Sequence, residues 1–366
     1  MKAEPVFRAL AELDEDLERL LVHTGQHYDQ EMSSVFIDEL GLPKPDVFLS
    51  VGPGTHAEQT ARALVGVERV LLEQKPSLVI VAGDVNSTLA AALAASKLRI
   101  PVAHIEAGLR SFDDSMPEEA NRRLTDHLSE ILLAHSEGAI TNMVREGLDA
   151  TRIHLVGNTM IDSVFRHLPG ALAREPWSKL GVEPGKFGLV TLHRPALVDD
   201  TAMLERTLES LINLGRDIPV VFPVHPRTKA RLAGRDAARL GELGLKLCPP
   251  LGYLAFLALE AKAMFVLTDS GGVQEETSAL GVRCFTLRDT TERPVTMEIG
   301  TNTVLGVDPD GIRTIPHLLQ QERVSRPIPL WDGKAGARAA EVIAQFLERS
   351  GKPSASTVAA PGRTWT

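Results

Sequence analysis

The sequence LTDSGGVQEE at residues 267–276 joins an apolar run to a helical pattern through a Ser-Gly-Gly turn. Glycine lets a ligand approach the backbone closely, and the free N–H groups and positive dipole end of a following helix favour a phosphate. We therefore predict an anion site held by Ser270, Gly271 and Gly272. Glu275 and Glu276 are expected in the first helical turn, with Glu276 binding a ribose hydroxyl. An ordinary strand-to-helix turn with acidic capping is the alternative.

Short runs rich in Val, Ile and Leu alternate with longer amphipathic stretches, a pattern typical of parallel sheets covered by helices. We predict strands at residues 20–23, 78–82, 102–105 and 131–134, and a second series at 187–192, 220–224, 246–248, 265–268 and 283–287. The pattern predicts an α/β fold in which two doubly wound, Rossmann-like domains, 1–169 and 170–350, face each other across a cleft. Residues 169–186 should connect them, and residues 351–366 should form a disordered tail.

The beginning of the chain departs from this pattern, because residues 3–13 are already helical in character and no strand precedes them. A doubly wound sheet normally begins with a strand. Without its first strand, neighbouring strands would keep unpaired edges and apolar surface would be exposed. We therefore expect the first domain of the chain as given to be compromised.

Composition narrows the class of protein. The 366 residues favour two domains, and 43% hydrophobic with 24% charged residues is typical of globular proteins. A net charge of -9 and a pI near 5.7 argue against sequence-independent nucleic-acid binding. Cys248 and Cys284 lie outside any metal-ligand spacing, so reduced, buried thiols are expected and a zinc site is not. Without a long apolar run or a secretory signal, we predict a cytoplasmic protein that does not enter membranes.

Three carboxylates follow predicted strands of the first domain or begin the next helix: Asp84, Glu106 and Glu118. Converging carboxylates suit proton abstraction and return, because in a cleft that excludes water one can hold a proton while another stays charged. Helix capping is the alternative for Asp84 and Glu118. Glu106, between an apolar strand and Ala-Gly, is harder to explain structurally.

In the second domain, TLHR at 191–194 and FPVHPRT at 222–228 place His193, Arg194 and His225 at strand ends. Arginine offers a planar set of donors to phosphate, and histidine can stabilise charge on a leaving diphosphate. Arg293, in the loop RDTTERP at 288–294, could reach the same phosphates, with a surface salt-bridge loop as the alternative. Phe256 could cover a base or pack in the core.

Six segments together resemble the non-hydrolysing UDP-N-acetylglucosamine 2-epimerases, which have a two-domain glycosyltransferase-B-type fold. They are GDVNST (83–88), HIEAGLR (104–110), PEEANR (117–122), TLHR (191–194), TDSGGVQEE (268–276) and RDTTERP (288–294). The likeness runs from Lys2 to about Val307, and the segments occur in the order of the family.

The resemblance implies interconversion of UDP-N-acetylglucosamine and UDP-N-acetylmannosamine, supplying N-acetylmannosamine for cell-surface polysaccharide, with no cofactor, neither NAD nor a metal. Such enzymes eliminate UDP to give 2-acetamidoglucal and then add it back. By motif, the acid/base residues would be Asp84, Glu106 and Glu118, with His193 acting on the departing UDP. UDP would contact Lys2, His225, Phe256, Ser270, Gly271, Gly272, Glu276 and Arg293. A homodimer is usual for such proteins.

Some bacterial members of this family bind a second UDP-N-acetylglucosamine as an activator, at positions that match Gln26, Arg62, Glu118, Arg194 and His225. Asp29 replaces the glutamine expected three residues after Gln26, which argues against this regulation. The family also begins with a strand ending in Gly-Thr-Arg-Pro-Glu and a lysine, of which Met1 and Lys2 alone remain. We expect translation to start upstream; a natural chain without that arginine would have its catalytic competence compromised.

Other functions share parts of this pattern. Close relatives epimerise UDP-2,3-diacetamido-glucuronic acid, and a hydrolysing epimerase would release free N-acetylmannosamine. A retaining glycosyltransferase has the same architecture but would not need three carboxylates in the first domain. A non-catalytic UDP-sugar binding protein would follow if the first strand is truly missing.

Overall fold

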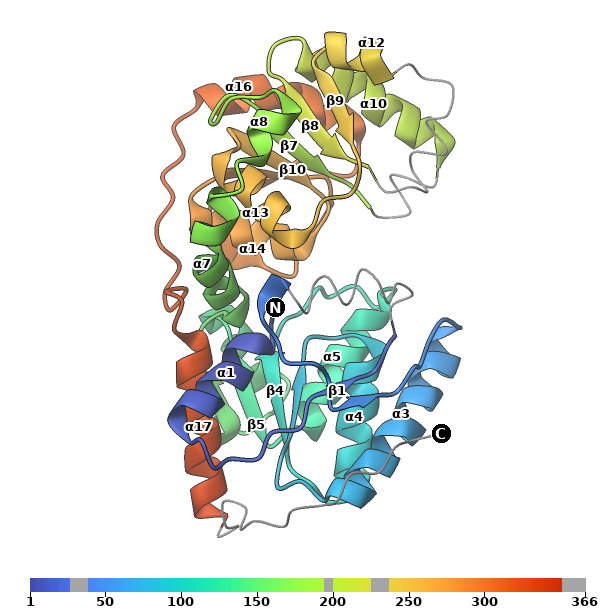
Figure 1. Ribbon diagram of the computed structural model, residues 1–366, viewed down its shortest axis with the longest axis vertical. Helices are drawn as coiled ribbons and strands as arrows, with labels where there is room; N and C mark the ends of the chain where they lie inside the picture. The colour runs from blue at the N-terminus through green and yellow to red at the C-terminus, as the bar shows by residue number, and fades with distance from the viewer. Residues whose placement is uncertain (27–38, 194–199, 225–236, 351–366) are drawn as a thin grey trace.

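The computed structural model describes residues 1–26, 39–193, 200–224 and 237–350. These residues form two lobes that are joined along one side by helix α7 (Thr159–Leu172) (Figure 1). Each lobe contains parallel strands flanked by helices. The predicted α/β class is therefore confirmed, with two Rossmann-like halves.

The lower lobe in Figure 1 holds the first half of the chain. Its strands are β1 (Val22–His23), β2 (Val47–Phe48), β3 (Val79–Ala82), β4 (Val102–Ala107), β5 (Ile131–Ala134) and β6 (Ile153–Leu155). Its helices are α1 (Glu4–Leu13), α3 (His56–Gln74), α4 (Asn86–Lys97), α5 (Pro117–Leu128), α6 (Glu137–Arg145), the 3-10 turn η1 (Ala150–Arg152) and the returning α17 (Ala335–Arg349).

The upper lobe holds the second half. Its strands are β7 (Gly188–Thr191), β8 (Val220–Pro223), β9 (Leu245–Cys248), β10 (Phe265–Thr268), β11 (Arg283–Thr286) and β12 (Asn302–Val304). Its helices are α8 (Pro176–Leu180), α10 (Thr201–Gly215), α12 (Ala237–Glu242), α13 (Tyr253–Lys262), α14 (Gly271–Leu280), α15 (Pro294–Glu298), α16 (Ile315–Gln320) and the 3-10 helix η2 (Pro309–Thr314).

The sheet of the upper lobe runs in the order β12-β11-β10-β7-β8-β9, and all of its strand pairs are parallel. Its central strands are buried on both faces because helices cover both sides of the sheet. The direction of strand succession reverses between β7 and β10, where Thr191 pairs with Thr268. In this topology ligands bind at such a reversal, beyond the carboxyl ends of the two strands.

The strands of the lower lobe form two separate parallel sheets, β3-β4-β5-β6 and β1-β2. Among the described strands, β1 pairs with β2 alone and β3 with β4 alone. One edge of β1 and one of β3 therefore have no strand partner in the described chain, as the sequence predicted. That the lobe is compromised by this stays a prediction.

Helix α17 packs in the core of the lower lobe although the predicted boundary at residue 170 assigns it to the second domain. Ala339, Ala340 and Ile343 of α17 are buried together with Val6 of α1 and Ile105 of β4. The amino end of α17 is capped from outside the helix, because the buried carboxylate of Asp162 on α7 accepts hydrogen bonds from the backbone N–H groups at 335 (3.1 Å) and 336 (2.7 Å). The cap ties α17 to α7.

The predicted strands are confirmed in place, with ends that differ by one or two residues, but three strands were missed. These are β2, β6 and β12, which have two or three residues and are too short for a hydrophobic period. The predicted connection at 169–186 is partly helical. Pro169 lies inside the last turn of α7, where it removes only one helical hydrogen bond, and α8 follows.

No helix in the described ranges is long and apolar enough to cross a membrane.

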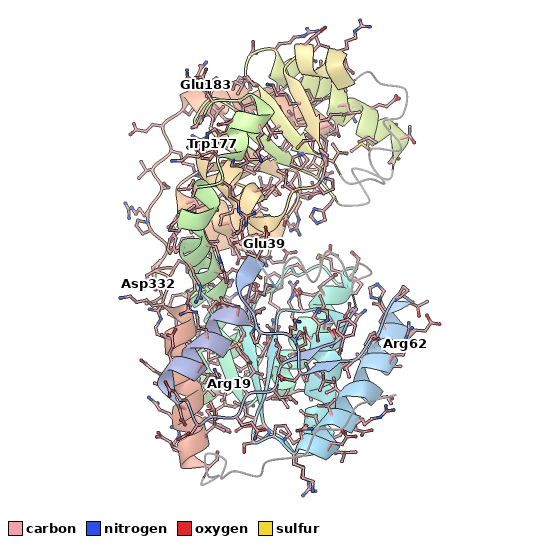
Figure 2. The ribbon with its side chains drawn as sticks, in the orientation of Figure 1. Arg19, Glu39, Arg62, Trp177, Glu183 and Asp332 are labelled. Carbon is pink, nitrogen blue, oxygen red and sulfur yellow. The ribbon has the colours of Figure 1, made fainter. Side chains whose placement is uncertain are left out.

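Replacing Asp162 by Ala should lower the free energy of unfolding by about 1–3 kcal/mol, because two buried N–H groups of α17 would lose their acceptor. Urea denaturation followed by circular dichroism measures this change. Glu183→Ala is the control, since its exposed side chain lies at the outer surface of the upper lobe (Figure 2) and pairs only with Lys186. Equal stability of the Asp162 variant and the wild type would contradict the capping role.

Candidate functional site

Glu106 has an unusual backbone conformation at the carboxyl end of β4. The pairing of β4 with β5 shifts register between Ile105 and Ala107, and the φ angle of Glu106 is +72°. A non-glycine residue with positive φ is strained, and bulges of this kind redirect side chains next to active sites. The bulge thus directs the carboxylate of a predicted site residue toward the upper lobe.

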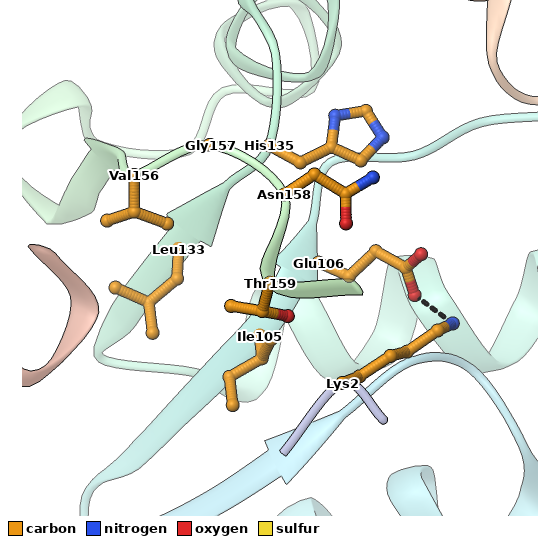
Figure 3. A pocket seen from close by; sticks show the side chains of 9 residues that line it. All are labelled: Lys2, Ile105, Glu106, Leu133, His135, Val156, Gly157, Asn158 and Thr159. Carbon is orange, nitrogen blue, oxygen red and sulfur yellow. Dashed lines mark hydrogen bonds and ion pairs between the residues drawn. The ribbon is translucent and has the colours of Figure 1, made fainter. Parts of the chain in front are cut away.

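Two cations contact the buried carboxylate of Glu106. The ammonium group of Lys2 donates a hydrogen bond to one oxygen, as Figure 3 shows, and Nη2 of Arg293 lies 3.3 Å from the other. Burial alone would raise the pKa of Glu106, but Lys2 and Arg293 outweigh burial and hold the pKa at about 2. Glu106 is therefore anionic at neutral pH.

Asp84 and Glu118 lie on elements beside Glu106. Asp84 follows β3 and accepts a 2.6 Å hydrogen bond from Arg122 of α5, and Asn121 donates to its backbone carbonyl. Glu118 is half-buried in the first turn of α5 and has no side-chain hydrogen-bond partner among the described residues. Asp84 is thus held by neighbours, whereas Glu118 keeps its oxygens available.

Glu119, next to Glu118, has a structural role instead. Its buried carboxylate accepts hydrogen bonds from the N–H and hydroxyl of Ser111 and from Arg122. Asn121 and Arg122 belong to the PEEANR segment at 117–122, but only Glu118 of this segment was predicted as a site residue. From α5, Asn121 and Arg122 hold Asp84 in place through hydrogen bonds to its backbone carbonyl and its carboxylate.

His193 follows β7 and is oriented by Asp269, which follows β10. Nδ1 of His193 lies 2.7 Å from one oxygen of the fully buried Asp269 carboxylate, and the His193 backbone N–H donates to the other at 2.8 Å. The side chain of His193 stays 63% exposed, so its other ring nitrogen is accessible to a ligand. Asp269 was missed as a partner because the pairing joins residues 76 positions apart.

The Ser-Gly-Gly turn has the predicted place between β10 and α14. Ser270 is the N-cap residue of α14 but its hydroxyl does not cap the helix, so this side chain leaves the first helical N–H groups free to bind an anion. The guanidinium of Arg293 lies against Gly271, since a Cβ there would come within 2.4 Å of Nη1. Glycine at 271 therefore makes room for a cation over the amino end of the helix.

The prediction that Glu275 and Glu276 lie in the first turn of this helix is wrong. The helix begins at Gly271, so both residues fall in the second turn and are buried. Burial raises the pKa of Glu275 to about 7, partly offset by Arg293, and raises the pKa of Glu276 to about 7, reinforced by Glu275. Two buried carboxyls of α14 in the upper lobe thus have a pKa close to neutral.

Glu275 contacts both lobes. Nε of Arg293 lies 3.1 Å from one oxygen, and Asn158 of the lower lobe donates to the other at 3.1 Å. His135, which follows β5, lies 3.7 Å from Glu275, and burial lowers its pKa to about 4, so it is neutral. His135 and Asn158 line the same pocket as Lys2 and Glu106 (Figure 3), although no sequence motif pointed to them.

The other nucleotide-side residues lie near α14. Glu276 is buried and its carboxylate is 3.4 Å from the hydroxyl of Tyr253, the first residue of α13. Phe256, on the same helix, is half-buried and packs against an apolar cluster, and its predicted contact with a base stays a prediction. Arg293 is buried in ion pairs, and Arg288 forms a buried bidentate pair with Glu292 at 2.7 and 2.9 Å, which excludes a surface salt-bridge loop.

The predicted regulatory residues are spread over the lower lobe. Gln26 accepts a 2.9 Å hydrogen bond from the backbone N–H of Ser87 at the start of α4. Arg62 is exposed on α3 at the flank of the lobe (Figure 2) and donates to the carbonyl of Pro53. Arg194 and His225 lie outside the described residues. In the part of the chain that the structure describes, no group of three His, Cys, Asp or Glu side chains could hold a metal ion.

Comparison with known proteins identifies the family. The family model described as UDP-N-acetylglucosamine 2-epimerase matches residues 10–344. The chain belongs to this family.

Members of the family resemble the chain over nearly its whole length. A UDP-N-acetylglucosamine 2-epimerase of Methanocaldococcus jannaschii is 42% identical, with 94% of this chain and 95% of the relative covered. A UDP-2,3-diacetamido-2,3-dideoxy-D-glucuronate 2-epimerase of Pseudomonas aeruginosa is 41% identical, with 94% and 96% covered. The solved structure of a Methanocaldococcus jannaschii UDP-GlcNAc 2-epimerase in complex with UDP-GlcNAc and UDP has a TM-score of 0.83 at 41% identity, covering 94% and 96% of the two chains.

In this epimerase-family protein, the raised pKa of Glu276 should make folding less favourable as pH rises. Between its ordinary pKa of 4.5 and about 7, the folded state binds more protons than the unfolded state, so the free energy of unfolding falls with increasing pH. Glu276→Gln cannot ionise and should flatten this decline. Urea denaturation at pH 5, 6 and 7 measures the slope.

Glu183→Gln serves as the control, because the pKa of exposed Glu183 is lowered by Lys186 and titrates below this window. An unchanged pH slope in Glu276→Gln would mean that Glu276 does not hold a proton in the folded protein.

Proposed function

We propose that this protein interconverts UDP-N-acetylglucosamine and UDP-N-acetylmannosamine. One observation carries the proposal: the ion pair of Arg293 with Glu106, which joins the carboxylates of the lower lobe to the glycine turn of the upper lobe. A reaction that both moves a proton and releases a diphosphate needs these two kinds of group in one place. Membership of the epimerase family supports the same reaction.

The proposed reaction has two balanced halves. A carboxylate takes the proton from C2 of the sugar while the bond from C1 to the UDP oxygen breaks, which gives 2-acetamidoglucal and UDP. UDP then adds back at C1, and C2 receives a proton on the opposite face. Asp84, Glu106 and Glu118 are the acid/base residues in this scheme. Lys2 and Arg293 keep Glu106 ionised at neutral pH, and its place at the end of β4, facing the upper lobe, supports its assignment to this set.

His193 acts on the departing UDP in this scheme, because charge builds on the diphosphate as the C1–O bond breaks. An exposed imidazole held by a buried carboxylate can stabilise or protonate that oxygen. Neither a redox step nor a Lewis acid is needed to balance the reaction, so the proposal includes no NAD and no metal.

UDP binds in the upper lobe in this proposal. The diphosphate lies on the Ser270-Gly271-Gly272 turn at the amino end of α14 and contacts Arg293. Glu276 binds the ribose, Phe256 covers the uracil, and Lys2 and His225 complete the phosphate contacts. The Methanocaldococcus jannaschii relative was solved in complex with UDP-GlcNAc and UDP, which supports these two ligands for this protein.

A homodimer in the cytoplasm completes the proposal. Two large apolar side chains of α3, Val65 and Leu72, are more than half exposed. Burying them against a second copy of the chain would stabilise a dimer. Light scattering after size-exclusion chromatography measures the mass of the assembly.

Incubation of the protein with UDP-N-acetylglucosamine in deuterated water tests the function. Proton NMR should show deuterium at C2 together with UDP-N-acetylmannosamine. Accumulation of free N-acetylmannosamine would instead indicate a hydrolysing enzyme. Binding of UDP without exchange would favour another substrate, such as a UDP-2,3-diacetamido-glucuronic acid, or a binding role.

Asp84→Asn, Glu106→Gln and Glu118→Gln should each lower turnover by at least ~100-fold, because each removes a group that holds or accepts a proton. UDP affinity, measured by calorimetry, should persist, since none of the three substituted side chains is itself a proposed UDP contact. Glu183→Gln is the matched control. Turnover near that of the wild type in all three variants would refute the acid/base scheme.

Asp269→Asn should lower turnover by roughly 10-fold or more, within the range of a group that acts through an acid/base side chain. An amide in place of the carboxylate no longer stabilises a protonated His193 and alters its orientation. Steady-state rates across pH 6–9 measure the effect. A profile that matches the wild type would show that His193 does not depend on Asp269.

A further inference from the structure

Glu260 is a buried carboxyl that the proposed reaction does not use. It lies on α13, its exposed fraction is 0%, and neither of its oxygens has a hydrogen-bond donor among the described residues. An ionised carboxylate in such a place would be very costly. Glu260 is therefore present as the neutral acid.

The group that interacts most strongly with Glu260 is the carboxyl of Glu276 on α14, which can form a hydrogen bond with Glu260 once one of the two carries a proton. Two carboxyl groups can share a hydrogen bond only when one of them carries a proton. Tyr253 lies two helical turns before Glu260 on the same face of α13, and its hydroxyl is 3.4 Å from Glu276. Helix α13 thus directs two O–H groups at one carboxylate.

The charges around the pair decide which partner keeps the proton. Glu276 faces Glu260, Tyr253, Glu275 and the amino group of Met1, whereas Glu260 faces Glu276, the Tyr253 hydroxyl and the Cys284 thiol and has no cation beside it among the described residues. Burial and then the charge of Glu276 raise the pKa of Glu260 well above its ordinary value, and Glu276 titrates nearer to neutral pH. The proton accordingly belongs to Glu260.

We propose that Glu260 is a positioning residue: its protonated carboxyl, together with the Tyr253 hydroxyl, holds the Glu276 carboxylate so that its remaining lone pairs accept hydrogen bonds from the ribose of a uridine nucleotide. The inference rests on the proposed function, in which Glu276 binds the ribose. It adds that selectivity for a ribonucleotide depends on a residue that does not contact the nucleotide.

Calorimetric titration with UDP and with 2′,3′-dideoxy-UDP tests this inference on the full chain. The wild type should prefer UDP by at least ~10-fold, since a hydrogen bond to a charged group is among the stronger ones. Glu260→Met, which fills the same space without a donor, should reduce the preference below ~3-fold. Glu260→Gln should restore most of it, because the amide N–H donates to Glu276 as the acid does.

A loss of affinity for both nucleotides alike in Glu260→Met, with the preference kept, would reduce Glu260 to a packing role and overturn the inference. So would a Glu260→Gln variant that behaves like Glu260→Met. If the wild type itself binds both nucleotides equally, the ribose contact of Glu276 is wrong and the inference falls with it.

Infrared difference spectroscopy at pH 7 gives a test that needs neither nucleotide binding nor the Met variant. Subtracting the spectrum of Glu260→Gln from that of the wild type should leave the carbonyl band of a protonated carboxyl. If Glu276 does not bind the ribose but Glu260 is protonated, the band persists. If Glu260 is not protonated, the band is absent. Its absence would overturn the inference even if the wild type selects UDP.

Discussion

The structure between the lobes depends on one buried cation, the guanidinium of Arg293. It lies between Glu106 of the lower lobe and Glu275 of the upper lobe, and it rests on Gly271. A buried charge is tolerated only when it is paired, so these contacts fix the loop after β11 and bring the bulge of β4 opposite the turn of α14. A diphosphate on the glycine turn would offer Arg293 new anionic partners and compete with the two glutamates.

Environment divides the buried carboxyls into two groups. Lys2 and Arg293 keep Glu106 anionic, whereas burial without a full complement of cations keeps a proton on Glu260 of α13 and raises the pKa of Glu275 and Glu276 of α14 to about 7. In the proposed reaction, the anionic group serves the proton transfer at the sugar. Glu260 and Tyr253 serve the proposed nucleotide site, where neutral donors can orient the Glu276 carboxylate without adding charge. The same side chain thus serves two purposes in two lobes.

Local rules explain which parts could be predicted from the sequence. The Ser-Gly-Gly turn follows from glycine between a strand and a helix, and the placement of Glu106 follows from a carboxylate at the end of an apolar strand. The pairing of His193 with Asp269 could not be found, because it depends on the neighbouring positions of β7 and β10 in the sheet. The positive φ of Glu106 and the return of α17 to the lower lobe likewise depend on contacts between distant segments.

The return of α17 also determines how the lobes can move. Two stretches of chain cross between them: α7 on the way up, and residues 321–334 on the way back (Figure 1). Trp331 of the second crossing donates to the carbonyl of His135, and the Asp162 cap joins the base of that crossing to α7. Both connections between the lobes therefore lie on one side of the molecule, in the arrangement of a hinge. Two connections on the same side would confine any relative movement of the lobes to a rotation about that side, which would return Glu106 to the same facing residues.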